Sequence, residues 1–293
     1  MRSDPRERGR MVDVRQTLKK VTFLNRVYTK LKWREQRKSW GKENSDKIFY
    51  VIRRATCKVG LFSYVMTNMG LVKDALEKGY IPVIDMCGNA NTYLEEDEIG
   101  EKNAWEFYFE QPCGYTLDDI SRSKNIILSN GLITGENQYP GEEIIWDREN
   151  RDAWKKIFRK YFHIRREIIE ETEALFERMF QGGRVLGGLC RGTDYLNNHP
   201  KNHPVQPETE MVIVHASKIM KEYHCEWIYL ATEDDIIYRK FSEAFGKKLK
   251  VTSARRSGDV GKRNINDVLQ QKGSRYQGGK DYLINIMLLA KCN

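Results

Sequence analysis

The stretch that decides the fold is Arg184–Leu196, which reads RVLGGLCRGTDYL. An apolar run from Val185 to Cys190 predicts a buried strand, and it ends abruptly in a polar turn that begins at Arg191. Ligands of open α/β sheets bind outside the carboxyl ends of the strands. A guanidinium there offers a planar fork of donors that suits two phosphate oxygens. We therefore predict a diphosphate site on Arg191, where Gly192 admits the ligand and Thr193 adds a hydroxyl.

Other interpretations of this turn stay open. The segment 187–193 nearly spells a phosphate-binding loop, but it lacks the lysine of that motif, which argues against an NTPase. Arg191 can instead form a salt bridge with Asp194 at the strand end. Asp194 can also cap a following helix.

The composition is that of a globular protein with one large or two medium domains. The chain has 293 residues, of which 40% are hydrophobic and 11% aromatic. Its six cysteines form no C-x-x-C pair, which indicates a reducing compartment. No apolar run approaches the ~18 residues that a membrane span needs, and the N-terminus lacks the apolar core of a signal peptide. We expect a protein on the cytoplasmic side of the membrane.

The net charge of +9 is concentrated at one end of the chain. Residues 1–47 hold 15 Lys or Arg and 6 Asp or Glu, whereas the remaining residues carry 35 of each sign. Within 14–34 the apolar positions recur at helical spacing: Val14, Leu18, Val21, Leu24, Tyr28 and Leu31. Such a basic amphipathic helix can lie on an anionic membrane. It can equally pack its apolar stripe on the protein. Nucleic acid is less favoured, because the rest of the chain adds no basic face.

The rest of the chain alternates strands and helices, which predicts parallel sheets with helices on both faces. In the first half, a strand at 48–57, a turn at Gly60, a helix at 63–78 and a strand at 80–86 form a βαβ unit. In the second half, the expected strands are 185–190, 227–231 and 249–252, and the expected helices are 208–223, 236–245 and 281–290.

The predicted organisation has three parts. Residues 1–47 form a basic tail and amphipathic helix. Residues 48–181 form an N-terminal α/β domain that ends with linking helices over 142–181. Residues 182–293 form a C-terminal Rossmann-like domain, with the boundary at the glycines that follow Gln181.

An acidic run, Glu233–Asp235, follows the predicted strand 227–231. Carboxylates at a strand end can hold a divalent cation on a diphosphate, or accept hydrogen bonds from ribose hydroxyls. They can also cap the helix that begins at Ile236. Capping and ligand binding remain compatible at this stage.

Two other patterns favour a structural role. His199 and His203 have a spacing that suits zinc on a helix, but the prolines that follow them exclude a helix there. An ordinary loop is therefore favoured over a metal site. Residues 103–110 crowd aromatic rings around Trp105, and such rings stack on sugars or, more often, pack in a core.

Two blocks at predicted strand ends together resemble motifs of the fucosyltransferase superfamily, which holds α1,6-, α1,2- and protein O-fucosyltransferases. Leu189–Asp194, LCRGTD, resembles its first donor-site motif, and Ile228–Asp234, IYLATED, resembles its second. Gly60–Phe62 with Gly79–Asp85 is similar to its N-terminal glycine turn and second strand, and Asn103–Phe109 to its aromatic block. The likeness is closest to short bacterial members and runs from about residue 48 to the end.

The resemblance implies a GT-B-like α/β fold, in which two Rossmann-like domains face each other across a cleft. It also implies GDP-fucose as donor, inversion at the anomeric carbon, and no cofactor or required metal. The donor-binding residues that it implies are Gly60, Leu61, Phe62, Arg191, Thr193, Thr232, Glu233 and Asp234. As acceptor contacts we predict Trp105, Tyr195 and His203.

This chain departs from the family pattern at three places. Leu189 stands where the family often has histidine, two residues before its arginine. His199 stands where α1,6 members have a glutamate base, so the base is one of Asp194, His199 and His203, and we predict Arg191, Asp194 and His199 as catalytic. The family also continues beyond this chain's last residue into a strand and a serine-bearing third motif. We therefore expect a C-terminally truncated member with an incomplete C-terminal domain.

The predicted function is an inverting glycosyltransferase that moves fucose from GDP-fucose to a surface polysaccharide or lipid-linked glycan. We expect no nucleic-acid partner, and peripheral attachment to the inner membrane face through residues 14–34. One alternative is a metal-dependent transferase of another nucleotide sugar that uses Glu233–Asp235. The other is a non-enzymatic basic module that binds membranes or nucleic acid.

Overall fold

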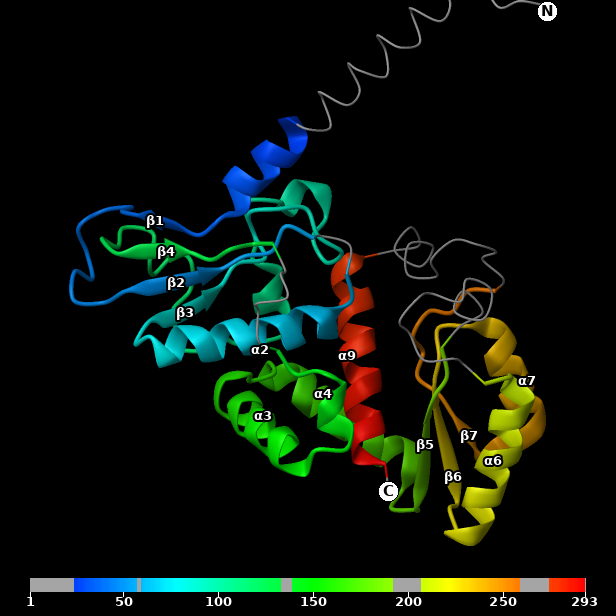
Figure 1. Cartoon of the computed structure of the whole chain (residues 1–293). Coiled ribbons are helices and arrows are strands. Elements are labelled where there is room, and N and C mark those ends of the chain that lie inside the picture. The colour runs from blue at the N-terminus through cyan, green and yellow to red at the C-terminus, as the bar shows by residue number, and fades with distance from the viewer. Residues whose placement is uncertain (1–23, 57–58, 133–138, 192–206, 259–273, 293) are drawn as a thin grey trace, which may run out of the picture. The chain divides into compact units, whose positions relative to one another are not determined.

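The computed structural model describes residues 24–56, 59–132, 139–191, 207–258 and 274–292 (Figure 1). The chain divides into two compact units. Unit 1 comprises Met1–Asn89 and Gln111–Tyr161, and unit 2 comprises Ala90–Glu110 and Phe162–Asn293. Each unit has a sheet of mostly or entirely parallel strands with helices packed on it, which confirms the predicted α/β class.

The sheet of unit 1 has the order β1-β4-β2-β3. Strands β2 and β3 are parallel, as are β2 and β4, whereas β1 runs antiparallel to β4 at one edge. Strand β2, FYVI, is hydrophobic and buried along its whole length, as expected for a parallel strand covered on both faces. The bounds are β1 Gln36–Lys38, β2 Phe49–Ile52, β3 Ile81–Ile84 and β4 Ile126–Leu128.

Helix α2, Leu61–Glu77, connects β2 to β3 and completes the predicted βαβ unit. Gly79 follows the C-cap residue Lys78, and its φ of +72° lies in the left-handed region that glycine adopts without strain. The amide of Tyr80 then donates to the carbonyl of Ala75 as the chain turns into β3. Farther along, unit 1 adds the short helix η3, Glu142–Ile145, and helix α3, Arg148–Tyr161.

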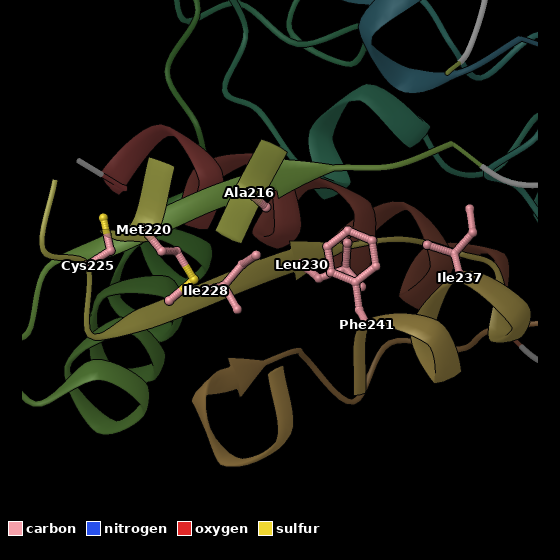
Figure 2. Packing of buried hydrophobic residues seen from close by; sticks show 7 residues of the cluster. All are labelled: Ala216, Met220, Cys225, Ile228, Leu230, Ile237 and Phe241. Atoms are coloured by element: carbon pink, nitrogen blue, oxygen red, sulfur yellow. The ribbon is translucent and has the colours of Figure 1, made fainter. Parts of the chain in front are cut away.

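The sheet of unit 2 has the order β5-β6-β7, and its strands are all parallel. A hydrophobic cluster fills the space between this sheet and helices α6 and α7 (Figure 2). Its buried members are Ala216, Met220, Cys225, Ile228, Leu230, Ile237 and Phe241. The bounds are β5 Val185–Leu189, α6 Thr209–Glu222, β6 Trp227–Ala231, α7 Asp235–Phe245, η4 Gly246–Lys248 and β7 Leu249–Lys250.

Helix α9, Arg275–Lys291, packs on β5 and β6 and against α4, Arg166–Phe180. The approach is close at Gly187, where an added Cβ would lie 2.9 Å from the Cβ of Cys292. The glycine in the middle of β5 therefore serves helix–sheet packing. Helix α9 begins six residues earlier than the predicted helix at 281–290.

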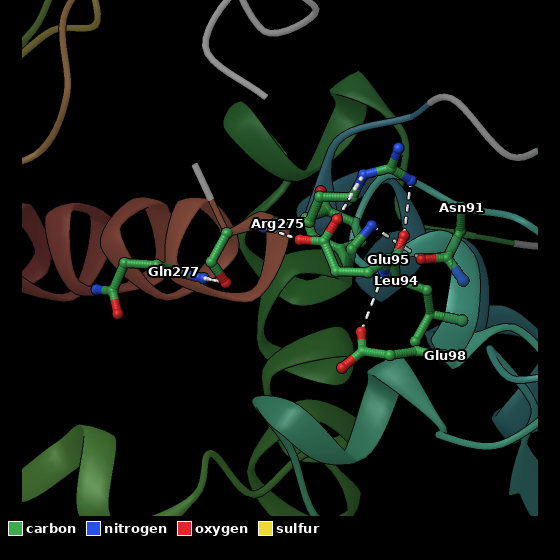
Figure 3. A network of polar contacts seen from close by, with 8 residues as sticks. Asn91, Leu94, Glu95, Glu98, Arg275 and Gln277 are labelled. Carbon is green, nitrogen blue, oxygen red and sulfur yellow. Dashed lines mark hydrogen bonds and ion pairs between the residues drawn. The ribbon is translucent and has the colours of Figure 1, made fainter. Parts of the chain in front are cut away.

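The aromatic segment of the first half belongs to unit 2. The Arg275 guanidinium donates to the carbonyl of Leu94 (2.6 Å) and pairs with Glu95, whose carboxylate also accepts from the amide of Arg275 (Figure 3). The Tyr108 hydroxyl donates to the carbonyl of Tyr276 (3.0 Å), and the two rings stack. This segment contains the short helices η1, Glu96–Glu98, and η2, Ala104–Phe107.

The compact units therefore divide the chain at other residues than the boundary predicted at 181–182. Residues 90–110 and helix α4 were expected in the N-terminal domain, but they lie in unit 2 because their packing partner is α9. The glycines after Gln181 end α4 without ending a unit.

Residues 24–33 are helical and lie in unit 1, in the basic segment. Leu24, Tyr28 and Leu31 are 63%, 64% and 51% exposed, so the part of the predicted stripe that the structure describes does not pack on the protein. Trp33, at the end of this helix, is buried. Within the described residues, no helix is long and apolar enough to cross a membrane.

Candidate functional site

The carboxyl ends of the three parallel strands in unit 2 lie at one edge of the sheet. Beyond β5, the amide of Cys190 still donates to the carbonyl of Ala231, so Arg191 is the first residue past the ladder. Thr232, Glu233 and Asp234 follow β6 directly. We call this edge, with Arg191 and residues 232–234, the strand-end site.

Arg191 faces Glu233 across the strand-end site. Its Nη1 lies 3.3 Å from Oε1 of Glu233, and the two side chains are 24% and 18% exposed. Because the pair is largely removed from water, its mutual attraction exceeds that of a surface ion pair. The sequence predicted both residues at this edge, but as separate ligand contacts. The rule that parallel strands end together was the signal that could have predicted the pair.

Asp234 caps helix α7, as one of the open interpretations had it. Its Oδ1 accepts hydrogen bonds from the amides of Ile236 (2.7 Å) and Ile237 (3.1 Å), and the residue is fully buried. Thr232 is also buried, and its Oγ1 accepts from the amide of Asp234 (3.2 Å). The side chains of both residues therefore hold the turn after β6. That they also contact a donor stays a prediction.

After β7 the chain returns to the strand-end site at Ser257, which forms a short parallel bridge with Asp234. The amide of Ser257 donates to the carbonyl of Glu233, and the amide of Asp235 donates to the carbonyl of Ser257, both at 2.9 Å. Ser257 is buried. The backbone that follows the Glu233 side chain is thus tied at two points to a neighbouring segment.

Arg256, next to Ser257, is a second arginine at this edge that the sequence analysis missed. Its Nη2 donates to the carbonyl of Thr252 (2.7 Å), and its guanidinium lies 4.6 Å from the centre of the Tyr238 ring. These contacts stabilise the loop after β7. Its place in the loop that follows the third predicted strand could have revealed it.

Cys190 precedes Arg191 but is not suited to nucleophilic chemistry. Burial, and secondarily the charge of Glu233, raise the pKa of its thiol to about 11. Because the reactive species of cysteine is the thiolate, a thiol with this pKa stays inert at neutral pH. Cys190 packs against the hydrophobic cluster of unit 2 instead.

The predicted glycine turn lies in unit 1, at the start of α2. Gly60 is the N-cap residue, with φ −67° and ψ 156°, and no heavy atom of the described residues lies within 4 Å of where its Cβ would be. Neither backbone strain nor crowding among those residues therefore requires glycine here. Leu61 is fully buried, so only its backbone can face a ligand; Phe62 is partly buried.

Trp105 corrects the predicted acceptor contacts. It is fully buried, it stacks on Phe109 at 4.5 Å between ring centres, and it contacts the edge of Phe162. Its indole nitrogen donates to the carbonyl of Glu110. A ring covered in this way offers no face to a sugar, so the aromatic block of unit 2 serves as core.

The remaining predicted site residues lie outside the described residues. They are Thr193, Asp194, Tyr195, His199 and His203, together with Gly192. Among the residues that the structure describes, no three His, Cys, Asp or Glu side chains form a cluster that could hold a metal ion.

No family model matches this sequence, and no curated protein matches it by sequence. Among solved structures it is similar to the α-1,6-fucosyltransferase NodZ soaked with GDP-fucose, at 18% identity and a TM-score of 0.48, over 84% of this chain and 86% of that chain. NodZ from Bradyrhizobium matches at 18% identity and a TM-score of 0.46, over 84% and 87%. POFUT1 in complex with GDP matches at 11% identity and a TM-score of 0.46, over 80% and 95%.

Proposed function

We propose that this protein is a glycosyltransferase that binds the diphosphate of a nucleotide sugar at the strand-end site, with GDP-fucose as donor. The observation that carries the proposal is Arg191 at the carboxyl edge of a parallel sheet, with its guanidinium placed against Glu233. A guanidinium binds two phosphate oxygens at once. The motifs LCRGTD and IYLATED resemble the donor site of fucosyltransferases and support the choice of donor. Of the first motif the structure describes Leu189–Arg191, which lie beside the second motif at this edge.

In the proposed reaction an acceptor hydroxyl attacks the anomeric carbon of fucose and inverts it. The new C–O bond forms as the bond to the diphosphate oxygen breaks, and a base takes the hydroxyl proton. Arg191 stabilises the charge that develops on the departing diphosphate. We propose Asp194, His199 or His203 as the base.

The donor can be identified with the intact protein. GDP, UDP and CMP are each added at the same concentration, and the melting temperature is measured. A ligand that binds only the folded state raises this temperature. We expect a rise with GDP alone, followed by turnover of GDP-fucose with an acceptor glycan. A rise with UDP or CMP alone contradicts GDP-fucose, and no rise with any of the three contradicts a nucleotide-sugar enzyme.

We further propose that turnover needs no divalent metal. In the strand-end site, one carboxylate pairs with Arg191 and the next caps α7, so both have partners within the protein. The diphosphate charge is met by Arg191 instead. Turnover is therefore expected to be unchanged in EDTA. Loss of turnover in EDTA that Mg²⁺ or Mn²⁺ restores would support the metal-dependent alternative.

We propose a glycan acceptor at a membrane surface, because the helix in the basic segment has exposed apolar side chains. Leu24, Tyr28 and Leu31 are exposed, and Arg26, Lys30 and Lys32 lie on the same helix. Apolar side chains of such a helix enter the headgroup region of a bilayer. Each basic residue near an anionic membrane surface strengthens the binding free energy by about 1 kcal/mol.

Co-sedimentation with vesicles tests this attachment. The protein is expected to bind phosphatidylserine vesicles, with binding that falls steeply as salt rises, and Leu24→Glu is expected to abolish it. Val214→Glu is the matched control, because Val214 is equally exposed (64%) but lies on α6 of unit 2. If the intact protein does not bind these vesicles at low salt, membrane attachment is refuted, but the transferase proposal is unaffected.

A further inference from the structure

The backbone around Glu233 is held by several hydrogen bonds. Its own carbonyl accepts from Ser257, and the next residue is anchored at both ends: the amide of Asp234 donates to Thr232, and its carboxylate caps α7. Thr232, Asp234 and Ser257 are all buried. The Glu233 side chain therefore starts from a rigid base at the end of β6.

From this base the Glu233 carboxylate reaches Arg191, on the neighbouring strand end, at 3.3 Å. The register of β5 and β6 places Leu189 opposite Ala231, so Arg191 and Glu233 are equivalent positions two residues beyond that pair. An arginine side chain has several rotatable bonds, and holding it in one orientation is costly in entropy. A carboxylate at the equivalent position of the adjacent strand lowers that cost, because it fixes one end of the guanidinium fork.

We infer that Glu233 is a positioning residue that orients the guanidinium of Arg191 for a diphosphate and does not itself contact the donor. The inference rests on the proposed function. The guanidinium carries five N–H donors, so it can keep one partner in the protein and bind phosphate oxygens with others. A carboxylate that contacted the diphosphate directly would repel it.

The consequence is that the effect of Glu233 on ligand binding passes through Arg191. Replacing Glu233 removes the orienting partner but also removes a negative charge near the ligand, and these two effects oppose each other. The inference requires that the loss of the orienting partner outweighs the loss of the negative charge. We expect Glu233→Gln to weaken GDP binding about tenfold, within the range measured for coupled neighbouring residues. Glu233→Asp, which keeps the charge on a shorter side chain, is expected to recover part of that loss.

A double-mutant cycle measures this dependence. GDP affinity is determined by calorimetry for the wild type, Glu233→Gln, Arg191→Ala and the double variant. If Glu233 acts through Arg191, Glu233→Gln no longer weakens GDP binding once Arg191 is alanine, and the affinity stays the same or rises slightly because a repelling charge is removed. Glu210→Gln is the matched control, because Glu210 pairs with Lys240 (2.7 Å) on the surface of the same unit. It is expected to leave GDP binding unchanged.

Losses that add in the double variant assign Glu233 a direct ligand contact and overturn the inference. Equal or tighter GDP binding by Glu233→Gln also overturns it. Melting temperatures of all variants separate a folding defect from a binding defect. If the wild type binds neither GDP nor pyrophosphate, the proposed function itself fails, and the inference fails with it.

Discussion

Both units of this protein place arginines just past the end of a parallel strand, and they use them differently. In unit 1, Arg53 follows β2 and donates from Nε to the carbonyl of Ser129 (3.1 Å) and from Nη2 to that of Arg34 (2.9 Å). Its neighbour Arg54 donates to the carbonyl of Ser63 (2.9 Å). In unit 2, Arg191 follows β5 and faces the carboxylate of Glu233. The position of an arginine after a strand is therefore not enough to make it a candidate for ligand binding. The groups to which its guanidinium donates must also be known.

The difference has a physical basis. Backbone carbonyls are fixed by the fold, so an arginine that binds two of them joins chain segments and adds to stability. Burial also lowers the pKa of Arg53 and Arg54, as expected where guanidinium groups leave water for a structural role. A side-chain carboxylate such as that of Glu233 instead pairs with the guanidinium as a charged partner, in the position where the inference above gives it an orienting role.

The largest effect is expected at Arg191. Arg191→Lys keeps the charge but loses the planar fork, so turnover of GDP-fucose should fall about 10²–10³-fold, nearly as far as with Arg191→Ala. Steady-state turnover of both variants measures this. Arg256→Lys is the control, because Arg256 lies at the same edge but donates to a backbone carbonyl. Near-normal turnover by Arg191→Lys would contradict bidentate phosphate binding and remove the contrast between the units.

A smaller effect of another kind is expected at Arg53. Arg53→Met keeps a stem that packs near Trp33 but removes both bonds to carbonyls. The free energy of unfolding should fall by about 1–3 kcal/mol, because charged donors to backbone contribute on this scale. GDP affinity should not change. Denaturant titration and calorimetry measure the two quantities, with exposed Arg122→Met as control. A loss of GDP affinity at full stability would make Arg53 a ligand contact.

The smallest effect is expected at Gly60. Serine suits an N-cap position, and the backbone angles there are open to any residue, so Gly60→Ser should leave the melting temperature unchanged or slightly higher. If the turn admits a donor to the backbone, the added side chain should weaken GDP binding about fivefold, roughly 1 kcal/mol. Gly278→Ser, also at an uncrowded glycine, controls for the substitution itself. Unchanged GDP affinity argues against a donor contact at Gly60.

The sequence predicted what depends on neighbours along the chain. The βαβ unit around Gly60 and Gly79, the strand before Arg191 and the cap before Ile236 all follow from local patterns. The structure adds what depends on distant residues. The partner of Arg191 is 42 positions away, and the burial of Trp105 depends on Phe162. Aromatic composition cannot distinguish a sugar platform from a core, because only packing decides which ring faces are covered.

The unit boundary was missed for the same reason. Two glycines after a helix are a local signal, whereas the attachment of residues 90–110 to α9 is made by contacts 168 to 181 positions apart, at Tyr108 and Arg275. The chain passes between the units three times, after Asn89, Glu110 and Tyr161.

This interleaving sets the order in which the protein can fold during synthesis. Unit 1 has its last segment by Tyr161, and it can close while the second half is still being made. Residues 90–110 leave the ribosome early, but Tyr108 waits for its partner Tyr276 until α9 follows. Pairings between such distant segments form slowly, and exposed aromatic surface is prone to aggregate in the interval. Splitting the chain at the glycines after Gln181 would make that wait permanent.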